Sequence, residues 1–395
     1  MVEERIFCIN SVSEYLDAIK SSTDSGSKIN LYYRGQSKIH EKALPSLLRE
    51  KKYESNEKNL IENFLTKDPE LFADSKNNFD SLALMQHHQL PTRLLDLTTN
   101  PLVALYFACE NAYKKYKLSA NDCNSLNKLD KYPKEGKSTN EITKEVPFCC
   151  GEIFVYSDKD TSINVGENNE KVEINDILKS PYSDQVEILS SMCRLKHEDK
   201  EEILKYVDLF YKKVSRGELK FEQWEEFYKE NIATTFEEEK RNNRFYLKNK
   251  MSLYNDFDDN IGVKRLYHEI RRDIKSFEPI INPFTLTFPK IITPRIIDDR
   301  IKNQRGLLLF VPFLKDLSTL DSNEIGNSSM PDVNDMINSL RVSVKGVNNN
   351  EKIVYVIPFG KKIEILKELA QIGITKSFIY PDHKYIAEEV SNSVL

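Results

Sequence analysis

The sequence has little of what marks several large protein classes. Only 12 of its 395 residues are glycine and 15 are proline, which excludes collagen-like and low-complexity chains. No apolar run approaches the roughly 18 residues that a membrane-spanning helix needs, and the start MVEERIFCIN does not resemble a signal peptide. None of the six cysteines forms a C-x-x-C pair. We therefore expect a cytoplasmic protein with reduced thiols and no membrane partner.

Familiar catalytic motifs are also missing. The sequence contains no G-x-x-x-x-G-K-[ST], G-x-G-x-x-G, H-E-x-x-H or G-x-S-x-G, so P-loop hydrolysis, zinc proteolysis and α/β-hydrolase chemistry have no support. His87 and His88 are adjacent and make a poor metal pair, so no metal site is expected. The 57 basic and 62 acidic residues give a net charge of -5, which disfavours a global electrostatic grip on nucleic acid.

Strand and helix patterns alternate along the chain, over a large supply of aromatic residues. The 19 tyrosines and 20 phenylalanines suffice for a sizeable core. Alternation over 29–33 predicts a strand that runs into Arg34-Gly35-Gln36, and Asn100-Pro101 predicts the start of a buried helix. Other predicted elements are strands at 306–310, 353–358 and 377–380 and a helix at 385–390. The expected fold class is α+β.

Shifts in composition divide the chain into five stretches. Lys, Asn, Ser and Glu dominate 117–147, which predicts a flexible insertion. Helical periodicity with a highly charged surface predicts a second, helical insertion at 183–257. The predicted stretches are 1–116 (first part of a core domain), 117–147 (flexible insertion), 148–182 (core strand region), 183–257 (helical insertion) and 258–395 (last part of the core).

Arg34 is the first candidate for a functional residue. A guanidinium at a strand end can hold a phosphate or carboxylate in bidentate fashion, and Gly35 beside it allows a tight turn or the close approach of a ligand. A buried ion pair, with Asp96 as a partner, explains Arg34 about as well. The residues alone leave both interpretations open.

Further polar candidates lie later in the chain. Thr92, Arg93, Asp96 and Thr98 are expected in a loop between helices, where ligand contacts concentrate, although Arg93 and Asp96 could simply pair or cap a helix. One of the two adjacent histidines could face a pocket while the other bonds to the backbone. Gln304 precedes an apolar strand, and a buried amide there needs partners, from the backbone or from a ligand.

The order of four motifs resembles one family. Tyr33-Arg34-Gly35-Gln36, the long stretch HHQLPTRLLDLTTNPLVALYFA from His87, RIKNQRGLLLF from Arg300 and IYPD near the C-terminus resemble the FRG domain, which is named for an aromatic-Arg-Gly motif. Tyr33 replaces the phenylalanine of that name. FRG proteins look like bacterial and phage-associated proteins, and the resemblance implies a role in conflict between the two.

The layout is similar, more weakly, to that of ADP-ribosyltransferases. That analogy implies a split, mostly antiparallel sheet with flanking helices, and NAD as the substrate. The implied catalytic residues are Arg34, Gln304 and His88. The implied NAD-binding residues are Arg34, Gly35, Gln36, Thr92, Arg93, Asp96 and Thr98. Gln304 stands where those enzymes have a glutamate, so it would bind a ribose hydroxyl without supplying negative charge.

The resemblance therefore implies an enzyme that modifies a macromolecule, either protein or nucleic acid, as a toxin or anti-phage effector. An antitoxin that neutralises it or a phage component that triggers it would be its partners. The alternative from another class is a non-catalytic module that uses the same pocket to recognise a nucleotide, a nucleic acid or a phage protein.

Overall fold

The structure is a computed structural model of the whole chain. It describes residues 4–22, 30–39, 43–110, 113–115, 145–147, 149–158, 161–165, 170–174, 177–218, 244–296, 298–317, 328–344 and 351–393. The predicted flexible insertion at 117–147 lies outside the described residues, except for its last three positions.

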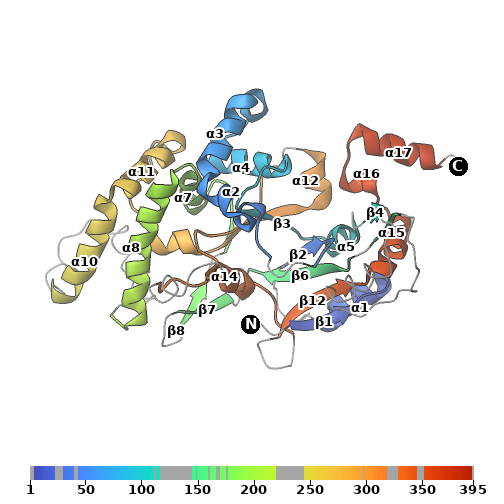
Figure 1. Cartoon of the computed structure of the whole chain (residues 1–395), viewed down its shortest axis with the longest axis horizontal. Helices are drawn as coiled ribbons and strands as arrows, with labels where there is room; N and C mark the ends of the chain where they lie inside the picture. Colours follow the sequence, from blue (N-terminus) through green and yellow to red (C-terminus); the bar gives the residue numbers. More distant parts are fainter. Residues whose placement is uncertain are drawn as a thin grey trace.

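The described residues form one central sheet of eight strands in the order β1-β12-β6-β2-β3-β11-β10-β9 (Figure 1). The strands are β1 (Glu4–Cys8), β2 (Leu31–Gln36), β3 (Leu94–Thr98), β6 (Gly151–Ser157), β9 (Leu178–Lys179), β10 (Lys290–Ile292), β11 (Gly306–Phe310) and β12 (Lys352–Ile357). Only β1 with β12 and β9 with β10 pair in parallel. The expected α+β fold with a mostly antiparallel sheet is therefore confirmed.

Two further strand pairs stand apart from this sheet. They are β4 (Tyr113–Lys115) with β5 (Glu145–Pro147) and β7 (Thr161–Val165) with β8 (Glu170–Ile174). The helices before the middle of the chain are α1 (Val12–Ser22), α2 (Lys51–Ser55), α3 (Glu57–Lys67), α4 (Asn78–His87) and α5 (Pro101–Cys109). Those after it are α7 (Asp184–Cys193), α8 (His197–Ser215), α10 (Arg244–Asp259), α11 (Ile261–Asp273), α12 (Asp299–Gln304), α14 (Val333–Ser339), α15 (Lys362–Gln371), α16 (Lys376–Ile379) and α17 (His383–Ser393).

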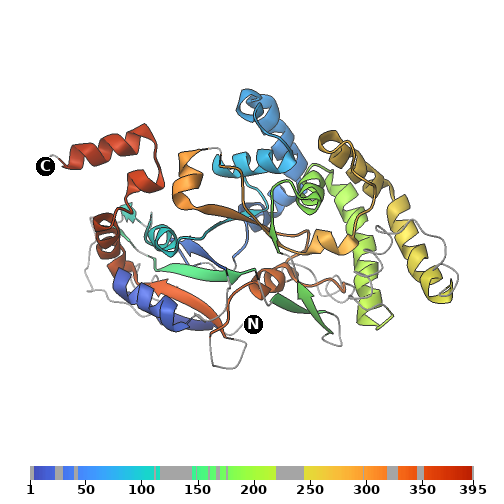
Figure 2. The same ribbon diagram turned by 180° about the vertical axis from the view of Figure 1, so that it is seen from behind.

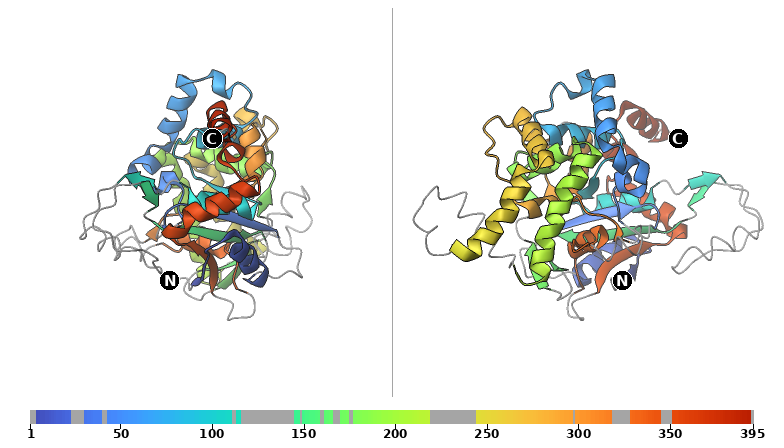
Figure 3. Two further views of the ribbon diagram at one scale, coloured as in Figure 1. Left: turned by 90° about the vertical axis from the view of Figure 1, so that its right-hand side faces the viewer. Right: turned by 60° about the vertical axis from the view of Figure 1, so that its left-hand side comes forward.

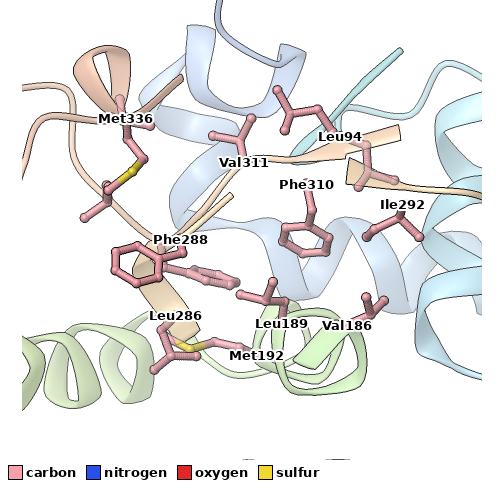
Figure 4. Close-up of a cluster of buried hydrophobic side chains, with 14 of the residues drawn as sticks. Leu94, Val186, Leu189, Met192, Leu286, Phe288, Ile292, Phe310, Val311 and Met336 are labelled. Atoms are coloured by element: carbon pink, nitrogen blue, oxygen red, sulfur yellow. The ribbon is translucent and has the colours of Figure 1, made fainter. Parts of the chain in front are cut away.

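Side chains alternate along the strands between two separate cores, as the pleat of a strand requires. Tyr33 packs with α1, α5 and α15 on one face of the sheet, whereas Tyr32 belongs to the larger core on the other face. Figures 1 and 2 show α1 and α15 next to β1 and β12, whereas α4 and α12 lie near β3. The larger core includes Phe310 and Leu189, which lie close together in Figure 4.

The helices α7, α8, α10 and α11 pack together at one end of the sheet (Figure 3). The stretch 183–257 contains α7, α8 and most of α10 and is helical in its described part, as the periodicity predicted, whereas α11 follows it. The side chains of α7 and α8 join the same hydrophobic core as β3 and β11. The helices are thus continuous with the main body and do not have a separate core.

Local sequence signals explain several element boundaries. The predicted cap of α5 is confirmed, because the Asn100 side chain accepts a hydrogen bond from the backbone N–H of Leu102 and Pro101 occupies the first turn. Two predictions were wrong. Leu94–Thr98 is the strand β3 and not a loop, and residues 376–379 form the helix α16 and not a strand. Four of the five residues of β3 are buried and only Asp96 is exposed, so its leucines do not show the alternation of a half-exposed strand.

The sheet is weakest between its two middle strands. β3 pairs with β11 over its full length, but β2 and β3 pair only at Tyr33 and Thr98. Beyond that pair the two strands part, although β2 stays paired with β6 along its whole length. No helix in the described residues is long and apolar enough to span a bilayer.

A buried carboxyl, Glu187, joins α4 and α7. Its Oε1 accepts hydrogen bonds from Asn78 Nδ2 (2.9 Å) and Ser191 Oγ (2.7 Å), whereas Oε2 is buried without a partner in the described structure. Burial raises the pKa of Glu187 from 4.5 to about 7, and the nearby Asp273 adds to the rise. Protonated Glu187 therefore stabilises the fold.

This stabilisation is complete below about pH 4.5 and is lost as the pH rises through about 7, because the folded state binds the proton more tightly than the unfolded state. Glu187→Gln mimics the protonated form, so we expect the melting temperature of this variant to fall less than that of the wild type between pH 5 and pH 8. Thermal unfolding at four pH values measures the difference. Equal declines for the two proteins would contradict the prediction.

Candidate functional site

The candidate site is a cavity of about 400 Å³ at the place where β2 and β3 part. One wall is formed by Tyr33, Arg34 and Gly35 of β2 and by the residues of β3. The opposite wall comes from α4 and α12, which lie above the strands in Figure 1. Strands β2 and β3 and helix α12 are far apart in the sequence, so only the folded sheet creates the cavity.

Arg34 crosses the gap between the parting strands. Its Nη1 donates to the backbone carbonyl of Asp96 (2.9 Å), and its Nη2 donates to the side-chain oxygen of Gln36 (3.5 Å). The Nε of Arg34 is buried and has no hydrogen-bond partner in the described residues. Arg34 contacts the carbonyl of Asp96 and forms no ion pair with its carboxylate, so the described contacts do not support the buried ion pair considered above.

Two further arginines line the same cavity. Arg49 ends the short helix η1 (Ser46–Arg49) and donates from Nε to the carbonyl of Leu44 (3.0 Å). Arg300 on α12 lies over the Tyr380 ring, 4.8 Å from its centroid. Burial lowers the pKa of Arg49, and the charge of Arg34 lowers it further, because the two guanidinium groups repel. Within the described part of the chain, none of these three arginines forms an ion pair with a carboxylate.

Asp96 is the one acidic residue among the described residues that line the cavity. Its side chain is exposed between the buried Leu95 and Leu97. Gln86 on α4 donates from Nε2 to its Oδ2 (3.2 Å), and Thr92 Oγ1 donates to the oxygen of the same glutamine (2.5 Å). This chain of hydrogen bonds fixes the carboxylate at the cavity.

Gln304 and Thr98 connect the cavity to the C-terminal segment. The hydroxyl of Thr98 donates to the backbone carbonyl of Gln304 (2.6 Å) and accepts from the backbone N–H of Asn100 (2.9 Å). The Nε2 of Gln304 donates to the carbonyl of Ile379 in α16 (2.9 Å). Gln304 and Arg34, 270 residues apart in the sequence, line one cavity.

Five of the predicted site residues therefore meet at the cavity, and four do not line it. The five are Arg34, Gly35, Asp96, Thr98 and Gln304. The nitrogen of Gln36 donates to Glu152 on β6 (2.9 Å) instead. His88 is exposed at the end of α4 and lines a neighbouring cavity, whereas His87 lines both cavities, with Nε2 3.3 Å from Oδ2 of Asp298.

The other two, Thr92 and Arg93, point away from the cavity. Thr92 is buried and acts through Gln86, as described above. Arg93 is buried beside Glu57, with Nε 3.0 Å from Oε1, and its guanidinium lies over the Phe313 ring at 4.3 Å. Lys200 also binds Glu57 (2.7 Å). Burial alone would raise the pKa of Glu57, but these two cations lower it below its ordinary value.

Gly35 has a structural role that differs from the one expected. It lies inside β2 and makes no turn, and a Cβ there would sit 1.8 Å from the carbonyl oxygen of Ala104. Helix α5 therefore approaches β2 so closely that only glycine fits. The sequence predicted that Gly35 would let a ligand approach the backbone closely, but it is helix α5 that does so.

Residues 29–117 match the FRG domain. This chain contains an FRG domain. Comparison with curated proteins and with solved structures found no match to the chain. The FRG domain contains Arg34, Arg49, Gln86 and Asp96, so it supplies the strand wall of the cavity and the α4 part of the opposite wall, and the last part of the chain adds Arg300 and Gln304. The described residues hold no cluster of three or more side chains suited to a metal ion.

Sequence reasoning missed five polar residues that line the cavity: Ser46, Arg49, Gln86, Gln89 and Arg300. Of the two adjacent histidines, His87 lines this cavity and the implied His88 does not. Arg300 could have been found, because it lies four residues before Gln304 and residues at this spacing share one face of a helix. Nothing in the local pattern singles out Arg49, which reaches the cavity only through the fold.

Arg93 and Arg34 provide a contrast that can be measured. Arg93→Ala leaves the buried Glu57 with one cation, and we expect a loss of about 3–5 kcal/mol in the free energy of unfolding. Arg34→Ala removes two hydrogen bonds, to the Asp96 carbonyl and the Gln36 side chain, at a partly exposed site, so its melting temperature should stay within a few degrees of the wild type. Urea denaturation of both variants tests this. A stable Arg93→Ala protein would show that Arg93 is not a structural ion-pair partner.

Proposed function

We propose that this FRG domain protein binds NAD in the cavity and transfers ADP-ribose to a macromolecule. One observation carries the proposal: three arginines without carboxylate partners in the described residues face one cavity of a chain whose net charge is -5. Positive charges gathered against their mutual repulsion favour an anionic ligand, and guanidinium groups suit a pyrophosphate in particular. The volume of about 400 Å³ lies within the roughly 300–1,000 Å³ typical of small-molecule sites.

NAD is favoured over a simple anion by the other residues of the cavity. Arg34 would hold the pyrophosphate, as the resemblance to ADP-ribosyltransferases implies. Phe107, which is only partly buried, lines the same cavity and offers aromatic surface for the nicotinamide or adenine ring. Gln304 would position the ribose through its amide oxygen and its second amide hydrogen. Gly35 and Thr98 would shape the floor of the cavity.

The target and the biological setting follow from the family resemblance alone. The acceptor would be a protein or a nucleic acid, and the protein would act as a toxin or anti-phage effector in bacteria. An antitoxin or a phage component would then control its activity. A non-catalytic module that only recognises a nucleotide would use the same arginines, and turnover separates the two functions.

Arg34→Ala tests the proposal directly. Loss of a hydrogen bond to a charged ligand costs about 1.5–3 kcal/mol, so NAD affinity should fall by about tenfold or more. Arg272→Ala, which removes an exposed arginine on α11, is the matched control and should bind NAD like the wild type. Isothermal titration calorimetry gives the affinity, and transfer from radiolabelled NAD to a cell lysate gives the activity.

The outcomes divide clearly. Binding that depends on Arg34, together with label on protein or nucleic acid, supports the transferase. Binding that depends on Arg34 without any turnover supports the recognition module. Absence of NAD binding by the wild-type protein would contradict the proposal.

A further inference from the structure

The cavity contains one negative charge whose position the fold controls closely. Asp96 lies in the middle strand β3, between two buried leucines, yet its carboxylate is exposed to the cavity. Because the side chain is exposed, water can solvate its charge and no ion pair within the protein is required. No ion pair of Asp96 exists in the described residues, although the guanidinium of Arg34 touches its backbone carbonyl.

The contacts of Asp96 orient its carboxylate without neutralising it. Oδ2 accepts from the neutral amide of Gln86 (3.2 Å), which Thr92 in turn holds (2.5 Å). The described structure gives Oδ1 no partner. A carboxylate fixed by one neutral donor, with its second oxygen left for a ligand, is prepared to face positive charge.

Gln304 has no such carboxylate. Its side chain is neutral, and its Nε2 donates a hydrogen bond to the carbonyl of Ile379 (2.9 Å). The charge that a glutamate would supply on the α12 side of the cavity is therefore missing there, while the β3 side has a carboxylate. Both residues line the same 400 Å³ cavity, so one ligand could contact both.

We infer that Asp96 is the catalytic carboxylate of the cavity, the group that stabilises the positive charge developing on the ribose of bound NAD. This inference rests on the proposed function. Arg34 then holds the pyrophosphate on one side of the Asp96 backbone, and the carboxylate of the same residue faces the reacting sugar. A single residue of β3 thus links the binding cation to the catalytic anion.

The step itself is a substitution at C1′ of the nicotinamide ribose. The bond between C1′ and the pyridinium nitrogen breaks, and nicotinamide leaves as a neutral molecule with the bonding electron pair. C1′ gains oxocarbenium character, which the carboxylate of Asp96 stabilises. A lone pair on a hydroxyl or amine of the acceptor, or on water, forms the new bond to C1′, and the acceptor loses one proton to solvent.

The test compares turnover with binding in Asp96→Asn. Asparagine has nearly the same shape and keeps an oxygen for Gln86, so only the charge is lost. We expect the rate of nicotinamide release or ADP-ribose transfer to fall by about 100- to 1,000-fold. NAD affinity, measured separately by calorimetry, should stay within about threefold or become tighter, because a negative charge near the pyrophosphate is gone. Asp74→Asn, at an exposed carboxylate that lines only the neighbouring cavity, is the control and should keep wild-type turnover.

Asp96→Ser is a second variant that removes the charge if the asparagine protein does not fold. Retention of at least a third of wild-type turnover by either folded variant overturns the role of Asp96 and leaves the proposed function standing. An equal loss of affinity and turnover also overturns it, because the role would then be binding. A wild-type protein that neither binds nor consumes NAD would overturn the proposed function, and the role of Asp96 with it.

Discussion

The parting of β2 and β3 after a single residue pair is the constraint on which the candidate site depends. Where two strands separate, their backbone groups lose each other as partners and need substitutes. Arg34 supplies one, because its guanidinium reaches across the gap to the carbonyl of Asp96. The strand that leaves β2 is held by β11 on its other side, so the sheet stays continuous while a cavity opens in its middle.

Close packing behind the sheet holds a helix against β2, the strand that borders this gap. A Cβ on Gly35 or on Gly151 of β6 would lie about 2 Å from a carbonyl oxygen of α5, at 1.8 and 2.0 Å respectively. Helix α5 therefore lies almost directly on the backbone of β2 and β6. The Arg-Gly pair joins two requirements in adjacent residues: the glycine admits the helix on one face, and the arginine faces the gap.

Local signals in the sequence predicted the elements that are fixed locally. The cap at Asn100 and the strands near 306–310 and 353–358 depend on neighbouring residues, and the structure confirms them. The strand β3 was missed because all its residues except Asp96 are buried, which removes the alternation that marks a half-exposed strand. Residues such as Arg49 reach the cavity only through contacts between distant segments, and a single sequence carries no local trace of those.

Arg93 and Asp96 are close in the sequence, but strand geometry places their side chains in different environments. They are three residues apart, and the ladder hydrogen bond from Val311 to Arg93 extends the strand to that position. Side chains at an odd separation along a strand point to opposite faces, so these two cannot pair. Arg93 therefore enters the core, where Glu57 and Lys200 complete a buried charge network, and Asp96 is left to the cavity. The same geometry that removes its obvious partner leaves the carboxylate free to serve a ligand.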